Sequence, residues 1–245
     1  MTTAPAADQQ RLLDVQALDT RLDQLAHRRR TLPELARLTE LDAQLADVAS
    51  ALVTSRTAAQ DLRRELVKAE GDVEQVRQRA ARNTERLNAG QGSAKDLQGM
   101  QHELESLARR QADLEEVELE VMERLEAHES ALAEVTKAHE QLTAEVDKVA
   151  AARDAAYAEL DAEVAVVTAA REGAVRGIDE GLLALYTRLR GQLGGVGAAA
   201  LRGSRCEGCR LDLNPADLDQ IRSASPDTVV RCEECGRILV RLPQG

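Results

Sequence analysis

Two long heptad patterns of apolar residues, separated by a short glycine-containing segment, constrain this chain more than any other feature. The first pattern covers residues 41–87 and the second covers residues 97–160, and neither breaks its alternating spacing of four and three residues. The segment between them, residues 88–96, contains two glycines, which take positive φ at low cost, and Ser93, which can cap a helix. The sequence therefore predicts an antiparallel coiled-coil hairpin over residues 8–175, with its tip at about 88–96.

The remaining segments divide around this hairpin. Pro33 cannot donate an amide hydrogen bond within a helix, so we predict a kink at about residues 31–34. Residues 1–7 are small and polar, and we expect them to be disordered. Residues 176–200 are interrupted by glycine and predict a connecting helix and strand, and residues 201–245 predict a small zinc-ribbon domain rich in β structure. The expected fold class is therefore mainly α, a long kinked antiparallel coiled-coil hairpin with a small C-terminal β zinc ribbon.

The composition narrows the function classes. The chain has no Trp or Phe and only two Tyr, whereas 31% of its residues are charged, which is typical of long helices with a narrow apolar seam. The net charge is −11, and residues 201–245 contain seven Arg and seven acidic residues, so the excess negative charge lies on the helical part. An acidic coiled coil is a poor surface for nucleic acid. No apolar run approaches membrane-spanning length and no secretory leader precedes the helices, so we expect a cytoplasmic protein without a membrane partner.

The four cysteines are the strongest chemical signal in the sequence. They form two C-x2-C pairs, Cys206 with Cys209 and Cys232 with Cys235, separated by 22 residues. Zn²⁺ prefers four deprotonated thiolates in a tetrahedron, and each pair presents two of them on one tight turn. We therefore predict one structural zinc ion per chain. Two disulfides or a redox-active pair are the alternatives, but the first requires an oxidising compartment and the second a βαβ context. A catalytic zinc is disfavoured because four cysteine ligands leave no position for water.

The segment around the cysteine pairs predicts the rest of a zinc ribbon. Asn214 followed by Pro215 is typical of the start of a helix. Residues 228–231 and 237–242 are apolar enough to form strands. Since ribbons of this size obtain on the order of 10 kcal/mol from their metal, we expect metal removal to unfold the chain from about residue 200 onward and to leave the hairpin folded.

These motifs resemble a bacterial family of coiled-coil proteins that end in a C4-type zinc ribbon, formerly described as a domain of unknown function. The resemblance covers almost the whole chain and is clearest at residues 93–97, 186–190, 206–209 and 232–239. It implies a long, kinked helical hairpin with the ribbon at its open end. Some relatives in this family are linked to flagellar or secretion-system regulation, through a sigma factor or messenger RNA.

Several functions remain open on the sequence alone. We expect a non-enzymatic adaptor or regulatory protein whose coiled coil and ribbon bind macromolecules, including a protein partner, for example one related to transcription. The alternative is an RNA- or DNA-binding regulator that acts through the arginines of the ribbon. The hairpin and zinc module also resemble secondary-channel regulators of RNA polymerase, which act through acidic residues at a tip. No small-molecule substrate is expected, and self-association and movement at Pro33 stay open. The candidate partner-binding residues are Lys95, Asp96, Arg202, Arg205, Arg210, Arg231 and Arg237.

Overall fold

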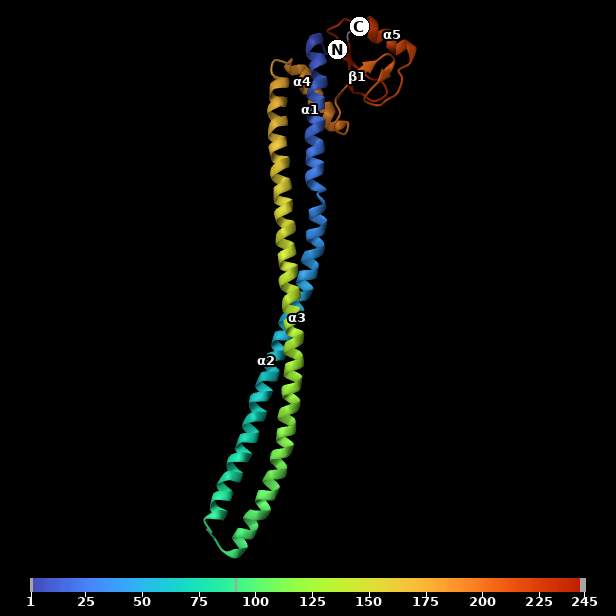
Figure 1. The fold of residues 1–245 in the computed structure, drawn as a ribbon. Helices are drawn as coiled ribbons and strands as arrows, with labels where there is room; N and C mark the ends of the chain where they lie inside the picture. Colours follow the sequence, from blue (N-terminus) through green and yellow to red (C-terminus); the bar gives the residue numbers. More distant parts are fainter. Residues whose placement is uncertain (1, 91, 243–245) are drawn as a thin grey trace. The chain divides into compact units, whose positions relative to one another are not determined.

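The computed structural model describes residues 2–90 and 92–242 and is mainly helical (Figure 1). It has two compact units, one built from Ala36–Ala150 and one from the two ends of the chain, up to Leu35 and from Ala151 onward. No helix among the described residues is both long enough and apolar enough to cross a membrane. The expected fold class is confirmed. The elements are α1 (Ala6–Arg30), α2 (Pro33–Asn88), α3 (Ala94–Val175), α4 (Glu180–Gln192), β1 (Ala198–Arg202), β2 (Arg205–Cys206), α5 (Pro215–Ser223), β3 (Val230–Arg231) and β4 (Ile238–Arg241).

In the unit Ala36–Ala150, α2 and α3 pack antiparallel along the seam that the heptads predict. Ion pairs join the two helices along the flanks of this seam, including Arg63 with Glu129 and Arg77 with Glu115, each at 2.6 Å. Apolar residues at heptad positions are therefore removed from water, while charged residues line the edges. The buried seam positions are Leu41, Leu52, Ala59, Leu62, Ala69 and Val73 on α2, and Leu114 and Val121 on α3.

One polar residue of the seam, His128, has a hydrogen-bond partner on the opposite helix. His128 Nε2 lies 2.9 Å from the backbone oxygen of Ser55 and 3.2 Å from its Oγ, so the imidazole donates to the neighbouring helix. A hydrogen bond across the seam fixes the register of the two helices at this level, because a shift would leave a half-buried polar group unpaired.

The hairpin tip forms where the glycines and Ser93 predict it. α2 ends at Asn88 and α3 begins at Ala94, and the backbone N–H of Ser93 donates to Asp96 Oδ2 at 2.9 Å. In return, the N–H of Asp96 donates to Ser93 Oγ at 3.3 Å, which completes a capping box. Gly90 has a φ of 63°. Residue 91 of the predicted tip lies outside the described residues.

The first arm breaks at the predicted proline. α1 ends at Arg30, and Pro33 is the first residue of α2, the position where a missing N–H costs no helical hydrogen bond. The intervening Leu32 is 8% exposed and packs in a cluster with Leu25 and Leu160. Apolar packing therefore continues across the break in the helix.

Residues 2–7 pair with other parts of the chain, whereas we expected residues 1–7 to be disordered; residue 1 lies outside the described residues. Thr3 pairs with Thr228 in an antiparallel bridge, and the N–H of Ala4 donates to the Asp227 carbonyl at 2.8 Å. Ala4 is 4% exposed, and α1 already starts at Ala6. The segment is held in place because its backbone pairs with the chain beside β3. The paired residues are more than 200 positions apart, so no local sequence pattern could have predicted the contact.

The four-stranded sheet joins the ribbon to the helices. Its strand order is β2-β1-β4-β3, with β1 parallel to β4, and β1 runs across the boundary that we expected between residues 200 and 201. Ile238 and Val240 on one face of β4 pack in a cluster with Leu12 of α1 and Tyr186 of α4. Leu239 on the other face packs with the buried cysteines. The strands β1 and β4 therefore contribute side chains to two apolar cores, one with the helices α1 and α4 and one with the cysteines.

Candidate functional site

The four cysteine sulfurs come together in one cluster, as the sequence predicts. All four Sγ atoms lie within 4.8 Å of one another, and the Cys206–Cys235 and Cys209–Cys232 pairs are each separated by 3.9 Å. A disulfide would need about 2.05 Å, so these are four separate thiols. Four thiolates at about 2.3 Å from a tetrahedral zinc ion lie about 3.8 Å apart. The donor set and its spacing therefore fit zinc.

The two cysteine turns have the same backbone geometry. The N–H of Arg210 donates to the Cys206 carbonyl at 2.7 Å, and the N–H of Gly236 donates to the Cys232 carbonyl at 2.8 Å. Both closing residues adopt positive φ, 61° for Arg210 and 74° for Gly236. Glycine fits the left-handed region at Gly236, whereas nothing in the sequence marks Arg210 as a position of this kind. Each turn directs its two sulfur atoms toward the centre of the cysteine cluster.

The protonation of the thiols is set by burial and by local hydrogen bonds. Burial raises the pKa of Cys206 and raises that of Cys232 to about 12. Burial opposes the thiolate of Cys235 as well, but hydrogen bonds from the backbone and side chain of Arg237 and from neighbouring thiols lower its pKa to about 7. A zinc ion bound here would displace protons from buried thiols, so its affinity would fall as the pH falls.

Two arginines of the ribbon stabilise loops. Arg237, a predicted partner-binding residue, donates to the carbonyls of Val196 at 3.0 Å and Leu193 at 3.1 Å. Arg241 was not singled out by the sequence, yet its guanidinium donates to five backbone carbonyls between Ile221 and Thr228, at 2.8–3.3 Å. These carbonyls belong to the end of α5 and to an irregular loop, so no spacing in the sequence could have indicated the contact.

Replacing Arg241 with alanine is expected to loosen this loop and the N-terminal segment beside it. The substitution removes the guanidinium from five carbonyls, of which those of Ser225 and Pro226 keep a second donor. Hydrogen bonds to a charged group each contribute about 1.5–3 kcal/mol. Faster amide exchange at residues 224–229 and at residues 2–5 would be the readout. Arg202→Ala is the matched control, since Arg202 is exposed and no hydrogen bond joins its side chain to a described residue. Equal protection in both variants would contradict the role given to Arg241.

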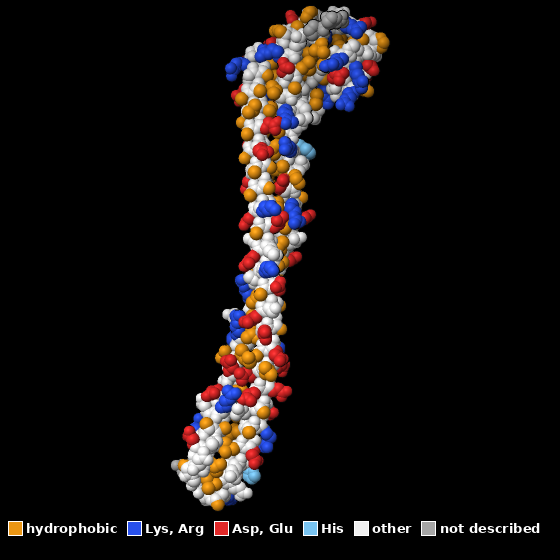
Figure 2. All heavy atoms as spheres, viewed as in Figure 1, with side chains coloured by type: hydrophobic (Ala, Val, Ile, Leu, Met, Phe, Trp, Pro, Cys, Tyr) orange, Lys and Arg blue, Asp and Glu red, His pale blue; other side chains and the backbone are white. Residues whose placement is uncertain are grey.

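The other predicted arginines of the ribbon are exposed. Arg202 and Arg205 lie opposite each other on β1 and β2, and Arg205 Nε donates to the Arg210 carbonyl at 3.0 Å. Arg231 Nε donates to the Gly236 carbonyl at 2.8 Å beside the second cysteine turn. No ion pair joins a ribbon arginine to an acidic group among the described residues, and basic side chains gather on this part of the surface (Figure 2). Like charges placed opposite each other across strands are unfavourable without a counter-ion.

The two predicted residues at the hairpin tip differ in their surroundings. Hydrogen bonds from the Ser93 side chain and backbone lower the pKa of Asp96, whose carboxylate caps α3. The side chain of Lys95 is exposed. Capping therefore already accounts for the aspartate at this position, and a partner-binding role for Lys95 and Asp96 stays a prediction.

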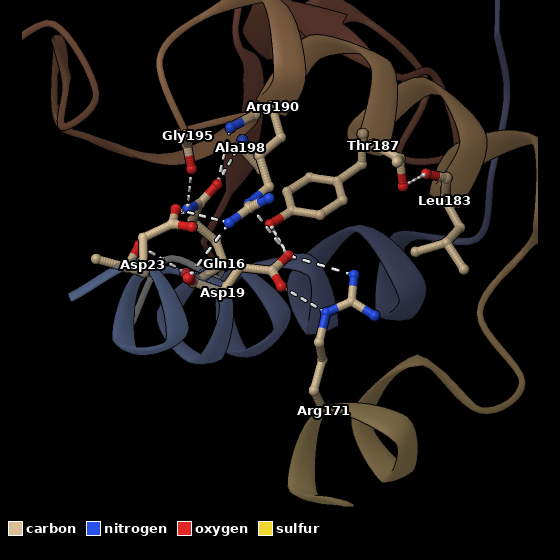
Figure 3. Close-up of polar contacts among 12 residues, drawn as sticks. Gln16, Asp19, Asp23, Arg171, Leu183, Thr187, Arg190, Gly195 and Ala198 are labelled. Atoms are coloured by element: carbon tan, nitrogen blue, oxygen red, sulfur yellow. Dashed lines mark hydrogen bonds and ion pairs between the residues drawn. The ribbon is translucent and has the colours of Figure 1, made fainter. Parts of the chain in front are cut away.

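A buried polar cluster at α1 was missed by the sequence analysis (Figure 3). Asp19 is 3% exposed and accepts hydrogen bonds from the Tyr186 hydroxyl at 2.7 Å and from Arg171 Nε at 2.5 Å. Arg190 Nε lies 3.5 Å from Asp19 Oδ2, and its Nη2 donates to Asp23 at 2.6 Å. Burial and the hydrogen bond to Asp19 raise the pKa of Tyr186 above its usual range, so its hydroxyl remains a donor. The resemblance at residues 186–190 includes Tyr186 and Arg190 but implied no buried cluster, and nothing in the sequence indicated Asp19.

Comparisons with known proteins agree with this architecture. The family model of the CT398-like coiled coil hairpin domain matches residues 15–194, and that of the C4-type zinc ribbon domain matches residues 205–239. A Mycobacterium tuberculosis protein is 38% identical over 242 residues, which cover 98% of this chain and 97% of that protein. A solved structure from Mycobacterium smegmatis has a TM-score of 0.85 and 39% identity, covering 98% of this chain and 100% of the other. CT398 from Chlamydia trachomatis has a TM-score of 0.66 at 17% identity, covering 96% and 98%, and shares the fold.

Proposed function

The chain belongs to the family of CT398-like coiled-coil hairpin proteins that end in a C4-type zinc ribbon, and we propose that it is a non-enzymatic adaptor. In this proposal one structural zinc ion, held by Cys206, Cys209, Cys232 and Cys235, keeps the ribbon folded as a binding surface for a macromolecule. The coiled coil provides a second surface for a protein partner. Because four reduced thiols are needed to hold the metal, the protein would act in the cytoplasm.

The observation that carries this proposal is the closure of the cysteine cluster. Its four sulfurs lie within 4.8 Å of one another and would supply all four ligands of a tetrahedral zinc ion, and Cys206 and Cys232 are buried at 0% and 2% exposure among apolar residues. A zinc ion in such a set has no open position for water or substrate, which is the mark of a structural site. The metal therefore supports the surface around it instead of performing chemistry, and the exposed arginines of the ribbon are part of that surface.

Capture of partners from native lysate tests the adaptor. The zinc-loaded chain, Cys232→Ser and the control Glu233→Gln would each be used as bait, with and without nuclease. Glu233 lies in the same turn as Cys232 but is exposed and supplies no sulfur. We expect nuclease-resistant protein partners that the intact chain and Glu233→Gln retain and Cys232→Ser loses. If no protein depends on the ribbon, the adaptor proposal fails.

The unpaired arginines favour a second candidate function, binding of RNA or DNA by the ribbon. Arg202, Arg205, Arg210 and Arg231 are exposed and lack ion pairs with described residues, so phosphates could neutralise them. The ribbon offers no aromatic side chain for base stacking, since no aromatic residue follows Tyr186. Such binding would be electrostatic, and its affinity for a labelled single-stranded RNA would fall steeply with salt. Partners of the capture experiment that nuclease removes would favour this candidate over the first.

A further inference from the structure

The row of ion pairs along one flank of the coiled coil is interrupted in the middle. Arg63 pairs with Glu129 and Arg77 pairs with Glu115, each at 2.6 Å. The first residues of these pairs are fourteen apart on α2 and the second are fourteen apart on α3, so the register places Glu70 opposite Met122 halfway between them. α2 thus has a glutamate where the positions above and below hold arginine, and α3 has a methionine where they hold glutamate. At this level of the coiled coil, Glu70 and Met122 occupy the positions at which the flanking levels have an ion pair.

Other apolar side chains extend this interruption into a surface. Met122 is 47% exposed, and Leu119, one helical turn before it on α3, is 55% exposed. Val67 lies one turn before Glu70 on the same side of α2 and is 66% exposed. Large apolar residues scattered singly on a surface are ordinary, but these three lie together on one flank of a two-helix seam. We call the surface formed by Val67, Glu70, Glu116, Leu119, Met122, Glu123 and Glu126 the acidic-apolar face.

The charge around these apolar residues has one sign. Residues 113–129 contain eight acidic residues and one basic residue, Arg124, although the chain as a whole is far more balanced. Glu116, Glu123 and Glu126 are exposed, and neither they nor Glu70 has an ion pair or hydrogen bond with any residue in 2–90 or 92–242. Lys68 contributes one positive charge at the border. Figure 2 shows exposed hydrophobic side chains beside acidic ones along this part of the coiled coil.

We propose that the acidic-apolar face docks a basic amphipathic helix of a partner protein. Apolar residues of that helix, spaced at i, i+3 and i+4, would cover Leu119, Met122 and Val67, while its Lys and Arg residues would meet the unpaired carboxylates. The carboxylates on α3 span residues 116–126, about 16 Å of helix, so a partner helix of about three turns is enough. Phosphate backbones are excluded by the charge. The inference deepens the adaptor function, because it names the surface and the chemistry of its protein partner.

Binding of a defined peptide tests the docking surface. The probe is a fluorescein-labelled helical peptide of Lys and Leu, about 18 residues long so that it can form a stable helix on the surface. Two further probes are a scrambled peptide of the same composition, which cannot separate an apolar from a basic face, and a Glu and Leu peptide. Fluorescence anisotropy measures their affinity for the zinc-loaded full chain, for the double variant Leu119→Ser with Met122→Ser, and for Glu70→Lys. Val53→Ser is the matched control, since Val53 is 65% exposed on α2 outside this face.

The Lys and Leu peptide is expected to bind the intact chain and Val53→Ser equally, and to bind both test variants at least tenfold more weakly. The scrambled and acidic peptides should bind the intact chain at least tenfold more weakly than the amphipathic one. Equal binding of the scrambled peptide, or an unchanged affinity in the double variant, would overturn the proposal. A dimer of the intact chain in sedimentation that the double variant abolishes would also overturn it, in favour of a second copy as the occupant. Failure here with ribbon-dependent capture intact would remove this surface alone and leave the adaptor function standing.

Discussion

Removing the metal is expected to release the cysteine turns and α5 while leaving the hairpin unit Ala36–Ala150 as protected as before. Cys206 and Cys232 lie in a small apolar cluster with Ile221 and Leu239, and four thiols without a metal cannot replace a stabilisation on the order of 10 kcal/mol. Hydrogen exchange of the full chain with and without a chelator measures the change. Residues 203–236 should lose protection, and native mass spectrometry should show the loss of one zinc ion per chain.

The two-sided sheet limits how far this unfolding spreads. Ile238 and Val240 pack against the α1 and α4 cluster, a contact that does not depend on the cysteines. We therefore expect β4 and the paired part of β1 to keep partial protection, in contrast to the complete loss from residue 200 onward that the sequence led us to expect. Cys232→Ser should reproduce the effect of the chelator, and Glu233→Gln should not. Loss of helical circular dichroism in proportion to zinc would contradict this account.

The features that could be predicted from the sequence are those that depend on residues close together in the chain. Heptads place the seam residues of α2 and α3 correctly because each helix repeats its own contact face. Likewise, the capping residues Ser93 and Asn214 act within three positions of themselves, as in the hydrogen bond from the Asp217 N–H to Asn214 Oδ1 at 3.3 Å. The two C-x2-C pairs identify the four cysteines that cluster, because each turn forms between residues close in the sequence and only the contact between the two turns is long-range.

The features that the sequence missed depend on contacts between distant parts of the chain. Arg241 donates hydrogen bonds to backbone carbonyls, which every residue type has. Composition and spacing therefore give no indication of this contact. The N-terminal pairing of Thr3 with Thr228 joins two backbones in the same way. In the sequence, Asp19 resembles any acidic residue on the surface of α1. It is buried because residues of α3 and α4 pack over it in the folded chain. Whether a charged residue is buried depends on tertiary contacts, and these cannot be deduced from the local pattern of one sequence.

Replacing Asp19 with alanine is expected to destabilise the unit that carries the ribbon by about 3 kcal/mol. Removing one partner of a buried ion pair leaves the other charge uncompensated, which costs about 3–5 kcal/mol, and the value falls at the low end because Arg171 and Arg190 remain 30% and 26% exposed. Amide exchange in α4, which reports the free energy of local opening, and thermal unfolding are the measurements. α4 should exchange faster, because Tyr186 and Arg190 are the side chains through which it contacts Asp19.

Two matched variants separate the buried charge from simpler effects. Tyr186→Phe removes one hydrogen bond to a charged acceptor and keeps the packing, so it should cost about 1.5–3 kcal/mol at most. Glu163→Gln breaks the exposed ion pair with Arg21 and should cost less than about 1 kcal/mol. The order Asp19→Ala, Tyr186→Phe, Glu163→Gln follows from the number of groups that each change leaves buried and unpaired. An Asp19→Ala chain whose α4 amides exchange as slowly as those of Glu163→Gln would show that packing in the Leu12 and Tyr186 cluster alone holds α4 in place.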